Sequence, residues 1–156
     1  MSNNFTQDRN AIIVAGLVAG TLDILAAFAT YYIMTGNGPM GVLLFVASGA
    51  FGNDAFSGGL PMAMMGLLFH YIIAFSFTLL FYVIARKLKA ILMHPIASGI
   101  AYGIMVWAFM NFVILPISHV NKPVFTIAGV TRGVLTIIFA VGLPIAIIIS
   151  RKLKRR

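Results

Sequence analysis

The sequence predicts an all-α integral membrane protein, in which four transmembrane helices form a bundle and a short interfacial or re-entrant helix lies between spans one and two. Three observations predict this fold class. First, 61% of the 156 residues are hydrophobic and only 9% are charged, and a water-soluble domain of this size could not bury so much apolar surface. Second, four apolar stretches are each long enough to cross about 30 Å of hydrocarbon, which takes about 20 helical residues. Third, most of the charged residues gather near the ends of these stretches.

The four predicted spans belong to a single membrane domain that covers residues 1–156. The spans are residues 11–34, 62–85, 96–117 and 126–149. Each is expected to be helical, because backbone amides inside lipid find no water to bond. Turn and helix-start signals separate the spans: "TGNGP", Pro61, Pro95 and "SHVNKP". Pro144 lies inside the fourth span and is predicted to kink it.

Residues 41–51, "GVLLFVASGAF", fit neither a loop nor a span. The segment is too apolar for an open loop and too short to cross the bilayer, which is typical of interfacial and re-entrant helices. Two interpretations remain open: a short helix that covers the outer mouth of the bundle, or a half-helix that lines a pore. The next residues, "GNDAFSGG", predict a flexible turn with Asp54 exposed.

The basic residues predict which side of the membrane each helix end faces. Of the 11 Lys and Arg residues, all except Lys122 and Arg132 fall near the two termini or in the "RKLK" between spans two and three. Since Lys and Arg are retained on the cytoplasmic side, both termini are expected in the cytoplasm. Such basic flanks also attract anionic lipid head groups. The lipid bilayer is therefore an expected partner, and nucleic acid is not, because the charges form no stripe along one face.

The first span carries a carboxylate, Asp23, near its middle. An Asp at mid-helix costs about 2.5 to 3.5 kcal/mol, whereas Leu, Ile, Phe and Val each return about 0.3 to 0.6 kcal/mol. The apolar residues of this span together return roughly 3 to 6 kcal/mol, so insertion survives. Asp23 is nevertheless expected to face protein and not lipid. Ala27, Phe28 and Ala29 resemble a signal-peptide cleavage site, but the apolar run continues to Met34, which favours an uncut helix.

One polar residue of each span is predicted to fall in the outer half of the membrane. Counted at about 1.5 Å per residue from the outer end, Asp23 lies roughly 17 Å deep, His70 roughly 13 Å, Asn111 roughly 9 Å and Arg132 between about 3 and 12 Å. We expect a convergent cluster in which Asp23 pairs with Arg132 or hydrogen-bonds to His70, and Asn111 completes the network. Arg132 can also snorkel to the interface, which leaves His70 as the better partner.

The predicted cluster has two functional interpretations. Intramembrane Asp and His residues build proton and solute paths, which favours a small transporter or channel-like unit. A polar group buried between helices can instead fix their register, which favours an accessory or structural subunit that stabilises a partner complex. A homo-oligomer or a larger membrane complex is compatible with both, since glycine faces allow further helix packing.

Glycines at helical spacing predict where the helices pack closely. Gly16 and Gly20 share a face with Asp23, and GxxxG pairs let helix backbones approach one another. The same spacing recurs in the third and fourth spans, and a glycine of the second span lies one turn from His70. The predicted packing positions are Gly16, Gly20, Gly66, Gly99, Gly103, Gly129 and Gly133.

The sequence predicts no enzymatic activity, no metal site and no cofactor. It contains no Cys and no Glu, and it has no HExxH, GxSxG or phosphate-binding loop motif. A haem would need two axial His residues in one bundle, and only His70 lies inside a span. Trp107 is expected to be a packing residue. Methionines near the outer face suit Cu(I), although methionine is also an ordinary gap filler: Met34, Met40, Met62, Met64 and Met65.

Two of the predicted spans resemble segments of known bacterial proteins. The runs "MGLLFHYIIAFSFTLLFYVIARKL" and "SGIAYGIMVWAFMNFVILPIS", with "AGTLDI" as a third element, look like small bacterial inner-membrane proteins of unknown function and, more distantly, the YagU-like group. The resemblance covers mainly spans two and three. It implies a multi-pass protein of the bacterial cytoplasmic (inner) membrane, and it carries over no catalytic residues.

Overall fold

A computed structural model describes residues 2–120 and 126–154, with side chains from residue 8 onward. Lys122, Arg155 and Arg156 lie outside the described residues. All regular structure within the described ranges is helical, as the sequence predicts. The helices are α1 (Ser2–Thr35), α2 (Met40–Phe51), the 3₁₀ helix η1 (Gly52–Ser57), α3 (Gly59–Lys87), α4 (Lys89–Met93), α5 (Pro95–Phe109), the π-helix η2 (Met110–Ile114), α6 (Leu115–Ile117), α7 (Ile127–Ile137), the π-helix η3 (Ile138–Gly142) and α8 (Leu143–Lys154).

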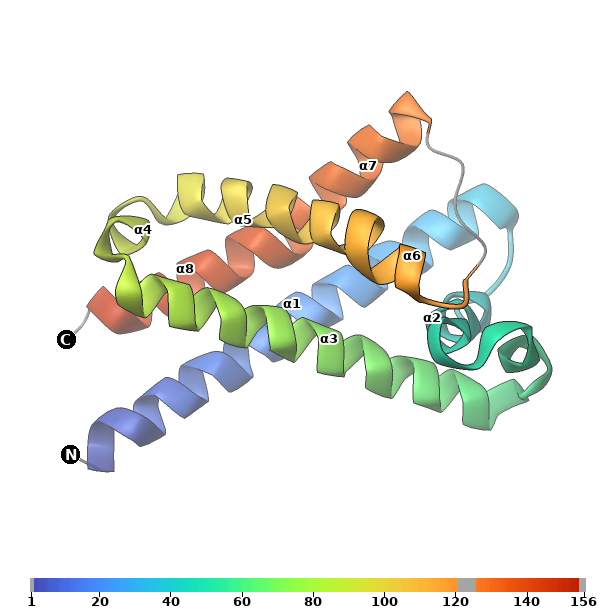
Figure 1. The fold of residues 1–156 in the computed structure, drawn as a ribbon, viewed down its shortest axis with the longest axis horizontal. Helices are drawn as coiled ribbons and strands as arrows, with labels where there is room; N and C mark the ends of the chain where they lie inside the picture. Colours follow the sequence, from blue (N-terminus) through green and yellow to red (C-terminus); the bar gives the residue numbers. More distant parts are fainter. Residues whose placement is uncertain (1, 121–125, 155–156) are drawn as a thin grey trace.

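The long helices run lengthwise, and both chain ends lie at the same end of the molecule (Figure 1). Figure 1 shows α1, α3, α5 and α8 along the long axis, with the N- and C-termini and α4 at the same end. Exposed basic side chains gather there, among them Arg86, Lys87 and Arg151, and we call this the basic end. The opposite end carries α2, η1 and α6, and we call it the α2 end (Figure 1).

Within the described ranges, 5 helical stretches are long and apolar enough to cross a membrane. Four correspond to the predicted spans: Asp8–Thr35, Gly59–Lys87, Pro95–Ile117 and Ile127–Lys154. The fifth is Met40–Ser57, where the sequence predicted a short helix and then a flexible turn. The chain instead continues from α2 into η1, where the Ser57 hydroxyl donates to the Asp54 carbonyl at 2.9 Å. This 3₁₀ extension brings the stretch to 18 residues.

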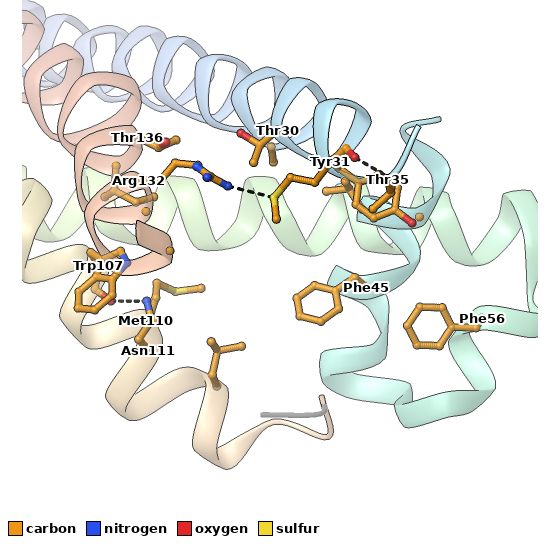
Figure 2. A pocket seen from close by; sticks show the side chains of 18 residues that line it. Thr30, Tyr31, Thr35, Phe45, Phe56, Trp107, Met110, Asn111, Arg132 and Thr136 are labelled. Atoms are coloured by element: carbon orange, nitrogen blue, oxygen red, sulfur yellow. Dashed lines mark hydrogen bonds between the residues drawn. The ribbon is translucent and has the colours of Figure 1, made fainter. Parts of the chain in front are cut away.

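The direction of α2 separates it from the other four stretches. It lies across the α2 end of the molecule, transverse to α1 and α3, in both views (Figures 1 and 2). A close backbone contact holds it there, because a Cβ on Gly66 of α3 would overlap the Leu43 carbonyl oxygen of α2. Gly66 therefore packs against α2, and no other residue type allows this approach.

Small residues bring the four lengthwise helices together. Ala15 and Ala19 of α1 are fully buried, as are Ile145 and Ile149 of α8. Because short side chains let helix backbones approach, van der Waals contact can hold such a bundle even in lipid. Aromatic rings fill the space between α3 and α5, where Phe81 and Tyr102 meet edge to face at 4.9 Å.

The predicted packing glycines differ in what they contact. Gly99 and Gly103 face the chain of η3 and α8 so closely that Gly142 lies against the Gly99 carbonyl. Gly16 and Gly20 lie under Phe75 and Tyr71 of α3, and Gly133 lies under Trp107. Gly129 is exposed, and the nearest side chain is its own helix cap, Thr126.

Two π segments interrupt the last two long helices, and each precedes a proline. Pro116 and Pro144 have no N–H, so the carbonyls of Phe112 and Ala140, four residues earlier, lose their helical partners. Those carbonyls lie inside η2 and η3, where the wider turns accommodate the loss. The kink predicted at Pro144 thus takes the form of a π segment, and α7 bends away from the line of α8 (Figure 1).

A buried carboxylate links α1 to α3 at the basic end. Asp8 is 8% exposed, and its Oδ2 accepts a hydrogen bond from the Tyr82 hydroxyl at 2.7 Å. Arg86 lies one turn further along α3, and its Nη1 donates to the same hydroxyl at 3.3 Å. The guanidinium also lies 5.7 Å from the centre of the Tyr82 ring. The sequence analysis did not single out this contact between helices.

Candidate functional site

A cavity of about 750 Å³ opens at the α2 end between α1, α2, η1, α7 and the α5–α6 stretch. We call it the chamber. Its volume is typical of small-molecule sites, which enclose about 300–1,000 Å³. Most of the lining is apolar, and Figure 2 shows the aromatic rings of Phe45, Phe56 and Trp107 around it. Its polar lining side chains are Thr30, Tyr31, Thr35, Asn111, Arg132 and Thr136.

Arg132 is the charged side chain of the chamber lining. Figure 2 shows it reaching from α7 toward α1, where its Nη1 lies 3.1 Å from the sulfur of Met34. A thioether is a weak acceptor, whereas a guanidinium has five N–H donors. No carboxylate bonds to Arg132 in the described part of the chain. The wall of the chamber therefore carries a cation whose donors suit an anion.

Asn111 and Trp107 form the wall that faces α7. The Asn111 amide donates from Nδ2 to the Trp107 carbonyl oxygen at 2.9 Å, within its own helix (Figure 2). Asn111 belongs to η2, and π segments often occur at functional sites. Trp107 packs edge to face on Phe112 at 5.9 Å, and a Cβ on Gly133 would lie 2.7 Å from its Nε1. The absence of a side chain at Gly133 therefore makes room for the indole.

Two further hollows adjoin the chamber and share side chains with it. The lateral groove, of about 430 Å³, lies between α1 and the α7–η3 stretch, and Arg132 and Thr136 line both it and the chamber. The α2–α3 cavity, of about 310 Å³, lies between α2, α3 and the η2–α6 stretch. Phe45, Met110 and Leu115 line both this cavity and the chamber.

Asp23 and His70 lie elsewhere, on the seam between α1 and α3. The Nε2 atom of His70 hydrogen-bonds to the carbonyl oxygen of Gly20 at 2.8 Å. Asp23 is half-buried and close enough to His70 for their charges to interact. Beside this pair, the hydroxyls of Thr21 and Tyr71 lie 2.8 Å apart. The structure therefore brings Asp23 near His70 and brings Asn111 and Arg132 to the chamber, and it does not join the two pairs.

Sequence analysis missed the chamber itself and several of its residues. It treated Trp107 as a packing residue, and it assigned no part in a site to Tyr31, Thr30 or Thr136. A usable signal was present, since hydroxyl and amide side chains recur near the α2-end termini of the apolar stretches. Across the described ranges, no three His, Asp or Glu side chains come together as metal ligands would.

Comparison of the chain with protein families, curated proteins and solved structures finds no match. The resemblance of spans two and three to small bacterial inner-membrane proteins therefore stays a prediction.

Proposed function

We propose that the protein is a four-span membrane protein that binds an amphipathic anion in the chamber, as a small solute-linked transporter would. The observation that carries the proposal is Arg132, a guanidinium with no bonded carboxylate among the described residues, on the wall of a largely apolar cavity. A cation at membrane depth is costly unless it is paired or hydrated. Guanidinium donors match carboxylate and phosphate oxygens. An anionic head on an apolar body suits both parts of the lining.

In the topology that we propose, the ligand enters the chamber from the outer side of the membrane. The spans are α1, α3, α5–α6 and α7–α8, and both termini lie in the cytoplasm, because the basic end carries most of the Lys and Arg residues. In this topology α2 lies at the outer surface and does not cross the membrane. The lateral groove then connects Arg132 to the outer leaflet between α1 and α7.

The topology is tested by labelling single cysteines, since the chain contains no Cys. Asn37→Cys places an exposed thiol before α2, Ser57→Cys places one at the last residue of η1, and Ala90→Cys places one at the basic end. In intact cells, a maleimide that cannot cross membranes should label the first two variants and leave the third unlabelled. Labelling of only one of the first two would mean that α2 crosses the membrane.

Ligand binding is tested with the chamber's own fluorophore, since Trp107 is the 1 tryptophan of the chain. In nanodiscs of neutral lipid, a dibrominated stearate should quench Trp107 saturably, because bromine quenches on contact. Arg132→Gln should weaken the apparent affinity about 10- to 100-fold, since a hydrogen bond to a charged group is worth about 1.5–3 kcal/mol. Arg151→Gln, at the basic end, is the matched control and should leave the curve unchanged.

The neutral analogue decides whether charge recognition is involved. A dibrominated stearyl alcohol of the same length reaches the same lipid but offers no anion, so Arg132→Gln should not alter its quenching. If the acid and the alcohol quench Trp107 with the same apparent affinity, the chamber is not an anion site. The same conclusion holds if Arg132→Gln leaves the quenching curve of the acid unchanged.

A further inference from the structure

We infer that the anion is a long-chain amphiphile whose hydrocarbon tail occupies the α2–α3 cavity while its head group lies at Arg132. This inference rests on the proposed function and adds the class of ligand. The cavity and the chamber share Phe45, Met110 and Leu115 as a common wall. A ligand anchored at Arg132 that extends past this wall enters the cavity without leaving the protein.

The lining of the α2–α3 cavity suits hydrocarbon and not a polar group. Its lining consists of aliphatic, aromatic and methionine side chains and glycine, apart from Ser118. The Ser118 hydroxyl already donates to the Leu115 carbonyl at 2.8 Å. A polar group placed in this cavity would lose its hydrogen bonds to water at a cost of about 1–3 kcal/mol or more, whereas a methylene chain loses none. The chamber therefore supplies the charge, and the α2–α3 cavity on the other side of the shared wall supplies the apolar space.

The shared wall is made of side chains that can move apart. Phe45 is 43% exposed and so is not packed into the core, and Figure 2 shows its ring projecting from α2 beside the chamber. Met110 adds an unbranched thioether chain, which adapts readily to irregular spaces. Rotation of these two side chains would join the two cavities into one elongated site.

The transverse direction of α2 explains why both cavities exist. Because Gly66 lets α2 lie directly on α3, one side of α2 closes the α2–α3 cavity while Gly41, Val42 and Phe45 line the chamber. A helix that ran parallel to α1 and α3 would fill this space. According to this inference, α2 separates the two parts of a binding site for a lipid-like ligand, and it is not a half-helix that lines a pore.

The inference is tested by locating the two ends of a bound chain. Stearate brominated beside its carboxylate should quench Trp107 more strongly than stearate brominated at its methyl end. A second reporter, Phe69→Trp in a Trp107→Phe background, places the indole in the lining of the α2–α3 cavity. For this reporter the order should reverse, with the methyl-end bromines quenching more strongly.

A variant that fills the cavity provides the control. A Cβ on Gly49 would meet its nearest neighbour, the Ser118 Cβ, at 3.8 Å, which is ordinary contact. Gly49→Leu should therefore fit and occupy the cavity. It should reduce methyl-end quenching of the Phe69→Trp reporter to the level that neutral stearyl alcohol gives, while head-end quenching of Trp107 remains. Gly38→Leu is the matched control, since a Cβ there meets nothing within 4 Å, and Ala50→Leu fills the same cavity if Gly49→Leu does not fold.

The outcomes separate this inference from the proposed function. If Trp107 shows no quenching that depends on Arg132, the anion site itself is absent and both proposals fall. If that quenching is present but the Phe69→Trp reporter responds equally to both bromine positions, only the tail assignment is wrong. The same conclusion holds if neither Gly49→Leu nor Ala50→Leu reduces the methyl-end signal.

Discussion

Removing one hydroxyl at the basic end should destabilise the helix bundle by a measurable amount. In Tyr82→Phe, the Asp8 carboxylate loses a donor at 2.7 Å while the ring stays in place. Asp8 is 8% exposed, so water replaces the lost donor poorly. A hydrogen bond to a charged group is worth about 1.5–3 kcal/mol, and we expect a loss of this size in the free energy of unfolding. The assay is equilibrium unfolding in mixed detergent micelles, followed by helical circular dichroism.

Two comparisons show whether the charge of Asp8 matters. Tyr71→Phe removes an exposed neutral bond to Thr21 and should cost about 0.6 kcal/mol, the average for hydrogen bonds between membrane helices. In an Asp8→Asn background, Tyr82→Phe should cost only about 0.5–1.5 kcal/mol, because the acceptor is then neutral. The reasoning is refuted if the Tyr82 and Tyr71 variants lose the same stability, or if the Tyr82 and Asp8 changes are additive within about 0.5 kcal/mol.

Two further predictions concern the packing of α2 and the seam between α1 and α3. Gly66→Ala should destabilise the protein by about 1–3 kcal/mol, the usual cost of overpacking. Gly38→Ala is the control and should have no effect, because a Cβ there meets nothing within 4 Å. Equal unfolding curves for the two variants would contradict the close contact between α2 and α3. His70→Ala should lower thermal stability, because the ring bonds to a carbonyl of α1, but neither it nor Asp23→Asn should change quenching of the chamber tryptophan. If either variant abolishes quenching while the fold is intact, the seam and the chamber act as one path.

The sequence predicted the long helices well because their signal is local. Each is a run of apolar residues of membrane length, and the flanking glycines and prolines mark where the runs end. The α2–η1 stretch was harder to predict, since residues 52–57 have the composition of a turn. Their 3₁₀ structure depends on hydrogen bonds such as that from Ser57 to Asp54, which composition does not reveal.

The neighbours of the polar residues could not be predicted from the sequence. Counting residues gives the depth of a side chain along a span, but not the neighbour that its helix face will meet. His70 and Asn111 have similar predicted depths, yet His70 bonds to α1 while Asn111 lines the chamber. The directions of the helices decide this, and they depend on contacts between distant residues such as Gly66 and Leu43.

The chamber was beyond prediction for a related reason. It forms where α7 bends away from α8 at a π segment and α2 lies across α3, so two departures from a regular bundle create it. The prolines offered a partial clue, since Pro144 predicted a kink, and Pro116 has the same relation to η2. No pattern within a single span indicates that these departures face one another.

The most direct test of the account is a high-resolution structure of the protein in lipid with bound stearate. We predict that the carboxylate lies about 2.7–2.9 Å from a guanidinium nitrogen of Arg132, the distance of a charge-assisted hydrogen bond, with the chain directed past Phe45. A carboxylate bound at the basic end instead, with Arg132 still in contact only with Met34, would contradict the account.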